Sequence, residues 1–417
     1  MGMAVPWKRV SYTSVIYLLF LALFLSTYSS PAQGYDINRV YSKYTYFILF
    51  FVFIITLLSL HFKKKQAVSV TVGMILFILL GGILIFSSIN RPSSLRWILT
   101  PVGWTLLWFL IIITGINAAD VGPKNYTSIF RWFTIRYAFA SLVIALIAAF
   151  ITHISIGPIT IIQYANYPRL AGWYVNPNGL APVLVTGVLC TISAGINELN
   201  KWSKASYYSL AILFAFGVLL TGSRGPTGTL IITLFVYITI KFKYKYKKLE
   251  HYHYMIGACI LFIGALIGLF LLARVDLFQR GSPFSRFEIW KNTPSIIRTS
   301  SALELLFGHG HLYFIDTVGL SSHSDYIRFL VNYGLLSIII LASIGAVTIR
   351  YISQYLKYGY TKREFDIALF SSLLVYISMY MIYGQATFQV RFSSFMLVAA
   401  IAPVFAYANP TIKLQHF

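Results

Sequence analysis

The stretch GLSSHSDYIRFLVNYGLLS, residues 319 to 337, places a histidine, a carboxylate and an arginine directly before a long apolar run. They are His323, Asp325 and Arg328. An imidazole titrates near neutral pH, and nearby arginines favour its neutral form. A neutral His323 can remove a proton from an incoming hydroxyl. The alternative is a histidine that caps the next helix or packs against its start.

A second polar cluster, LTGSRGPTG at residues 220 to 228, forms a very tight connection between two apolar runs. It holds Arg224 at the edge of a membrane, and Pro226 is expected to start the next helix. Arg224 can be an arginine that snorkels to the interface. With Ser223 and the backbone N–H groups of a helix start, it can instead attract an anion. A planar guanidinium suits a pyrophosphate through two parallel hydrogen bonds.

A third cluster lies in a long connection, residues 274 to 325. Arg280 and Arg286 precede FGHGHLYF, in which Gly308 and Gly310 predict a tight turn. His311 and the two histidines on either side of it along the chain, at positions 309 and 323, are potential metal ligands. The chain has only 11 acidic residues and no D-x-D pair, so a metal site is kept as an alternative. We expect neither a metal nor another cofactor.

A further polar stretch, RLAGWYVNPNGLA at residues 169 to 181, begins with Arg169. Pro177 and the asparagines on both sides of it are typical of a turn and a helix N-cap. Aromatic residues also occur in this stretch and in the long connection, and these could stack on sugar rings: Trp173, Tyr174, Trp290 and Tyr313.

The elements that must position these clusters are apolar. Of the 417 residues, 58% are hydrophobic and 11% are charged, whereas a soluble domain has roughly 25% charged residues. Runs long enough to cross a bilayer predict an all-α polytopic membrane protein with about 12 transmembrane helices. This is a single transmembrane domain over residues 1–417, with the loop 274–325 inserted between the ninth and tenth helices. The runs are 12–29, 44–60, 68–86, 97–116, 136–156, 178–196, 207–221, 226–241, 254–273, 326–349, 366–384 and 390–407.

The net charge of +22 predicts membrane orientation rather than nucleic-acid binding. Alternate connections hold 20 of the 33 Lys and Arg residues, so this side is predicted to be cytoplasmic, together with both termini. The polar clusters above then share the extracytoplasmic face. The long loop there is amphipathic in SRFEIWKNTPSIIRTSSALELLF, which predicts short helices on or near the membrane surface. Cys190 and Cys259 lie inside apolar segments and are expected to be core residues.

In this order, RLAGWYVNPNGLA, LTGSRGPTG, the long loop with Arg286 and Trp290, LFGHG and SSHSDYIRFLVNYGLL resemble the O-antigen ligase and polysaccharide polymerase superfamily. The resemblance covers residues 169 to 340, and the hydropathy extends it along the chain. The order and spacing of the motifs carry it, because each motif alone is weak. The chain departs from the family in having Ser324 where an asparagine often follows the histidine.

The resemblance implies a metal-independent, inverting glycosyltransferase with a GT-C-like fold on the outer face of a bacterial inner membrane. Its donor and acceptor would be undecaprenyl-pyrophosphate-linked glycans, and a chain-length regulator is a possible partner. The family's residues match Arg224 and His323 here, and Arg286 with Arg280 as competitor. Residues expected to contact substrate are Arg169, Arg280, Trp290, Asp325 and Arg328.

The sequence form HSDYIRFLVNYG favours a polymerase, which extends one lipid-linked glycan with another. One alternative is a ligase, which transfers the glycan to lipid A–core. Another is a transporter of lipid-linked oligosaccharides, although transporters tend to show repeated halves.

Overall fold

A computed structural model describes residues 72–89, 122–150, 153–156, 159–162, 170, 177–245, 289–310, 313–319, 322, 324–358, 365–383 and 392–407. These residues are helical apart from one hairpin. The helices are α3 (Val72–Ile89), α5 (Pro123–Phe150), α6 (Pro177–Asn197), α7 (Lys201–Leu220), α8 (Arg224–Lys245), α12 (Asn292–Thr299), α13 (Ala302–Phe307), α14 (Tyr313–Val318), α15 (Asp325–Tyr358), α16 (Ile367–Tyr383) and α17 (Phe392–Tyr407). The hairpin pairs β1 (His153–Ile156) with β2 (Ile159–Ile162) in antiparallel register.

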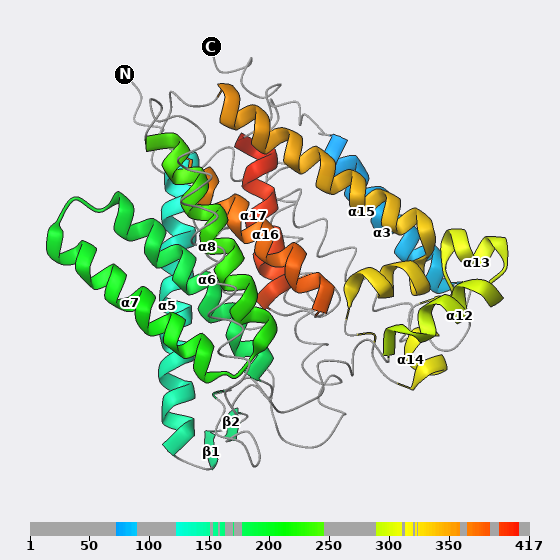
Figure 1. Ribbon diagram of the computed structural model, residues 1–417, viewed down its shortest axis with the longest axis horizontal. Coiled ribbons are helices and arrows are strands. Elements are labelled where there is room, and N and C mark those ends of the chain that lie inside the picture. Colours follow the sequence, from blue (N-terminus) through cyan, green and yellow to red (C-terminus); the bar gives the residue numbers. More distant parts are fainter. Residues whose placement is uncertain are drawn as a thin grey trace, which may run out of the picture.

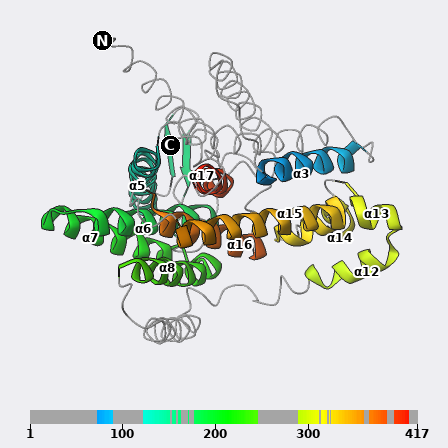
Figure 2. The same cartoon turned by 90° about the horizontal axis from the view of Figure 1, so that it is seen from above.

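The long helices form a bundle around α6 and α16 (Figure 1). Helix α6 packs between α5 and α7, α16 packs on α8 and α17, and α3 lies along α15. The short helices α12, α13 and α14 gather at one end of α15, away from α7, as the view from above also shows (Figure 2). The fold therefore joins a helical bundle to a compact module of short helices.

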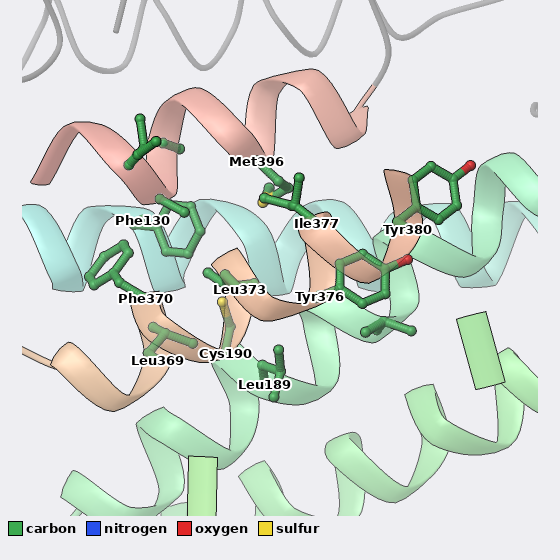
Figure 3. Packing of buried hydrophobic residues seen from close by; sticks show 14 of the residues in the cluster. Phe130, Leu189, Cys190, Leu369, Phe370, Leu373, Tyr376, Ile377, Tyr380 and Met396 are labelled. Carbon is green, nitrogen blue, oxygen red and sulfur yellow. The ribbon is translucent and has the colours of Figure 1, made fainter. Parts of the chain in front are cut away.

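Within the described part of the chain, four helices are long and apolar enough to cross a membrane: they cover Pro123–Ala149, Asn178–Asn197, Lys201–Leu220 and Asp325–Leu356. Helix α6 is the most enclosed of these because small residues let its neighbours approach closely. A Cβ on Gly187 would lie 2.7 Å from Cβ of Ala138 on α5 and 2.9 Å from Phe214 on α7. The core continues between α5, α6, α16 and α17 (Figure 3) through Phe130, Leu189, Cys190, Leu369, Phe370, Leu373, Tyr376, Ile377, Tyr380 and Met396.

The coarse prediction of a helical membrane protein agrees with these elements. Eight of the predicted apolar runs coincide with helices, namely α3, α5, α6, α7, α8, α15, α16 and α17. The runs 12–29, 44–60, 97–116 and 254–273 lie outside the described residues. Short helices in the long loop were also predicted, and α12, α13 and α14 confirm them.

Three details of the prediction are wrong. Helix α5 begins at Pro123 and ends at Phe150, so residues 153–156 of the predicted span form β1. Helix α8 begins at Arg224 rather than at Pro226, because a proline fits anywhere in a first turn whose N–H groups have no helical partner. The predicted span 326–349 is part of a longer element that is broken near its start.

The break in α15 is at Gly334, whose φ of 79° and ψ of 178° are not helical. This conformation is essentially open to glycine alone. It divides α15 into a first segment, residues 325–333, and a long second segment that changes direction (Figure 1). A break leaves carbonyls without helical partners, and here the loop between α13 and α14 supplies donors. The N–H of His309 donates to Val331 O at 3.1 Å, and that of Gly310 donates to Asn332 O at 2.9 Å.

Close approach of the two backbones makes this docking possible. A Cβ on Gly308 would overlap the backbone of Asn332 and Tyr333, and one on Gly334 would overlap the backbone of Leu306 and Gly308. Gly308 also has a positive φ of 82°. The predicted tight turn at Gly308 and Gly310 is thus confirmed, and its role is to fill the break in α15.

Candidate functional site

The turn before α8 forms a polar corner. The hydroxyl of Thr221 donates to Val218 O at 2.7 Å and accepts from the N–H of Ser223 at 3.3 Å. The hydroxyl of Ser223 donates to Asn178 Oδ1 at 2.8 Å, which joins the turn to the first turn of α6. Arg224 is half-buried, and among the described residues its side chain forms no hydrogen bond or ion pair. A cation at the N-terminus of a helix makes this corner attractive to anions.

Leu170 brings a second part of the chain to the same corner. It is buried, and its N–H donates to Leu220 O at 3.2 Å, at the end of α7. Its neighbour Arg169 lies outside the described residues. The polar stretch that begins at residue 169 therefore reaches the Arg224 turn through Leu170.

Ser322 and Ser324, on either side of position 323, are held by hydrogen bonds to each other and to two other parts of the chain. Trp290 Nε1 donates to Ser322 O at 2.7 Å. The hydroxyl of Ser322 donates to Ser324 O at 2.9 Å, and that of Ser324 donates to Met381 O on α16 at 3.4 Å. Trp290 thus links the long loop to the entrance of α15. His323 itself lies outside the described residues.

The first segment of α15 buries a polar face. Asp325, Arg328 and Asn332 follow helical spacing, and their exposed fractions are 0%, 7% and 2%. Asp325 interacts electrostatically with the Arg328 guanidinium, so the buried cation has a carboxylate nearby. Asn332 Oδ1 accepts the N–H of Phe314 at the start of α14, 3.2 Å away. These groups face protein, so any contact of Asp325 or Arg328 with a substrate is still a prediction.

The Arg224 corner and the Ser324 turn lie at one end of the bundle. Lys241 on α8 forms an ion pair of 3.0 Å with Asp366, just before α16, so α8 and α16 run antiparallel. At 1.5 Å per residue, Arg224 and Met381 lie about 25 and 22 Å along their helices from that ion pair. Because Ser324 contacts Met381, it lies at the same end of the bundle as Arg224.

The remaining electrostatics belong to the loop module. Hydrogen bonds from the N–H and hydroxyl of Ser301 lower the pKa of Glu304, and the nearby His309 lowers it further. Ser301 and Glu304 form a reciprocal capping box at the start of α13. Glu304 therefore stays ionised at neutral pH, and its carboxylate interacts with Ser301 and His309.

Several predicted site residues cannot be compared with the fold. Arg286, Arg280, Arg169 and His323 all lie outside the described residues, as do Trp173 and Tyr174. Within the described ranges, no group of three His, Cys, Asp or Glu residues could hold a metal. Cys190 is buried in the core as predicted, and Cys259 lies outside the described residues.

Sequence reasoning missed a polar network at the opposite end of the bundle. Asp366 accepts hydrogen bonds from the hydroxyl of Ser193 and from Leu369 N, and it pairs with Lys241. Arg131 donates to Ser193 O at 3.1 Å. The network joins α5, α6, α8 and α16. A signal for it existed in the sequence, because acids are scarce and Asp366 directly precedes an apolar run.

No protein-family model matches this chain, and no curated protein matches it. The structure therefore defines only the class of protein, a helical protein with helices of membrane-spanning length and polar groups at both ends of its bundle.

Proposed function

We propose that this chain is a membrane glycosyltransferase that polymerises a polysaccharide. It would transfer an undecaprenyl-pyrophosphate-linked glycan onto a sugar hydroxyl of another lipid-linked repeat unit. The fold of the whole chain would then be a GT-C-like arrangement of about 12 spans in a bacterial inner membrane. Both termini would be cytoplasmic, and the site would face the extracytoplasmic side.

One observation carries the proposal: the Arg224 corner and the serines on either side of position 323 lie at the same end of the bundle. A cation at a helix N-terminus suits the pyrophosphate of a lipid-linked donor. Burying an arginine at membrane depth costs roughly 2.5–3.5 kcal/mol on insertion scales, and an anionic ligand paired with the guanidinium would offset part of that cost.

In the proposed reaction, Arg224 and Arg286 bind the donor pyrophosphate and stabilise the charge that develops on it. His323 removes the proton from the acceptor hydroxyl. The hydroxyl oxygen attacks the anomeric carbon from the face opposite the pyrophosphate, whose bond to that carbon breaks. Undecaprenyl pyrophosphate leaves with the electron pair, and the configuration of the carbon inverts.

The test uses the purified full chain in nanodiscs with a defined lipid-linked repeat unit and with chelator in place of divalent metal. We expect the glycan to lengthen on its polyprenyl carrier. His323→Ala should reduce the rate at least about a hundredfold, because it removes the general base. Size-exclusion behaviour and yield should match those of the unchanged chain.

Two results would replace the proposal. Transfer to lipid A–core without lengthening of the lipid-linked glycan would identify a ligase. Movement of the lipid-linked glycan across the bilayer, with no new glycosidic bond and no effect of His323→Ala, would identify a transporter.

A further inference from the structure

The module of α12, α13 and α14, together with Trp290 just before α12, holds the first segment of α15 at both of its ends. At the start, Trp290 donates to Ser322 O. At the far end, His309 and Gly310 donate to the carbonyls of Val331 and Asn332. Between these points, Ile296, Phe314 and Val331 form a small apolar cluster that is separate from the main core. The position of the segment is therefore set by the module rather than by α15 alone.

The side chain of His309 connects the parts of this module. Its Nε2 lies 2.7 Å from Ser300 Oγ at the end of α12, and its Nδ1 lies 3.3 Å from Glu304 Oε1 on α13. Its ring stacks on Tyr313 of α14, with centroids 4.0 Å apart and planes 12° apart. Because its backbone N–H binds Val331, His309 contacts all three short helices and α15.

The hydrogen bonds of Ser300 indicate which protons His309 carries. A serine hydroxyl has one proton, and Ser300 Oγ lies 2.6 Å from Ile296 O, to which it donates. Ser300 must then accept from Nε2 of His309. Nδ1 faces the Glu304 carboxylate 3.3 Å away, so an imidazolium would donate at both nitrogens. Neutral His309 keeps one of these donors: the tautomer with its proton on Nε2 loses the bond to Glu304, and the tautomer with its proton on Nδ1 requires Ser300 to donate to Nε2 in place of Ile296 O.

We propose that His309 is a positioning residue that, when protonated, fixes the first segment of α15 and with it the turn at Ser322 and Ser324. The inference rests on the proposed function in one respect: the turn is taken to support the general base. The clamp consists of the hydrogen bonds from the His309 side chain to Ser300 and Glu304, and it loosens when the imidazole loses its proton.

Other ionisable groups surround the clamp. Those in direct contact with His309 are Glu304 and Tyr313. The remaining charged side chains on the elements packed around His309 are Lys291, just before α12, Arg298 on α12, Asp316 on α14, and Asp325 and Arg328 on the first segment of α15. Carboxylates and arginines keep their charges over roughly pH 5 to 8, whereas imidazoles titrate there.

The experiment measures amide hydrogen exchange of the full chain in nanodiscs, in peptides that cover residues 324–333. His309→Phe keeps a ring that can stack but has no donors. Since one hydrogen bond to a charged group corresponds to roughly tenfold or more in a local opening equilibrium, we expect exchange there to rise by about that factor. His309→Gln keeps one donor nitrogen, the side-chain NH₂ group, and should rescue part of the protection. Thr317→Ala, an exposed change on α14, is the control.

The pH dependence distinguishes the clamp from simple packing. After correction for intrinsic exchange, protection in the unchanged chain should fall between pH 5.5 and 8, because deprotonation removes one donor. In His309→Gln it should not change. In the polymerisation assay, His309→Phe should lower turnover and leave the donor KM unchanged.

Each outcome decides the matter. Unchanged exchange in a monodisperse His309→Phe chain would overturn the clamp, whatever its activity. Faster exchange with unchanged turnover would overturn the positioning role. Faster exchange in a chain whose unchanged form does not polymerise would support the clamp and reject the proposed function.

Discussion

Arg224 occupies the first position of α8, where backbone N–H groups have no partner within the helix. Its location could be predicted from residues 220 to 228, because glycines and a proline between two apolar runs allow little freedom. The hydrogen bond between Ser223 and Asn178 could not, since it joins residues that are distant in sequence. The position of a residue in a short, constrained turn can thus be predicted from the local sequence. Its hydrogen-bond partners from other helices cannot, because tertiary packing determines them.

Replacing Arg224 tests the corner at the scale of one residue. Arg224→Lys keeps the charge but loses the planar pair of donors, so we expect the donor KM to rise about tenfold, the effect of one lost charged hydrogen bond. The same change at Arg136, which stacks over Trp132 on α5, should leave KM unaltered. Steady-state kinetics with the lipid-linked repeat supply the measurement. Equal effects at the two positions would mean that Arg224 acts only through general charge.

At the scale of elements, the sequence predicted most of the helices and missed how α15 is divided. An apolar run from 326 to 349 is consistent with one continuous span, and a glycine within it carries no clear signal. The break depends on donors from Gly310 and His309, which precede it by more than twenty residues. Helical periodicity describes a single segment and does not reveal such a partner.

The break predicts unequal effects for two glycines of the same helix. Gly334→Ala places a Cβ against the backbone of Leu306 in a conformation that costs about 1–3 kcal/mol for other residues, so the melting temperature should fall. Gly345 has no atoms within 4 Å of a built Cβ, and Gly345→Ala should be neutral or stabilise by up to about 1 kcal/mol. Thermal unfolding in nanodiscs compares them. Similar melting temperatures for both variants would contradict the close approach.

For the whole molecule, the alternation of cations along the sequence has a counterpart in the bundle. Lys201 starts α7 and Lys241 lies near the end of α8, whereas the Arg224 corner and the loop module lie toward the other end (Figure 1). The positive-inside bias predicts which end is cytoplasmic. The packing of α6 against its neighbours was not predictable, because an apolar composition shows that helices associate and not which ones do.

Cysteine labelling tests the orientation. Trp202→Cys and Thr317→Cys are both exposed positions, near the two different ends. In a Cys259→Ser background, with Cys190 buried, a membrane-impermeant maleimide added to intact spheroplasts should label position 317 and not 202. Opening the membrane should make both react. Labelling of position 202 from outside would reverse the assignment and remove the site from the extracytoplasmic face.

The ion pair between Lys241 and Asp366 has a consequence for how the protein is made. The ribosome completes α8 well before α16, so Lys241 is synthesised before Asp366, its carboxylate partner. Until then, anionic lipid headgroups at the membrane surface can pair with Lys241. A chain that stalls short of Asp366 leaves Lys241 without the carboxylate that it has in the complete fold.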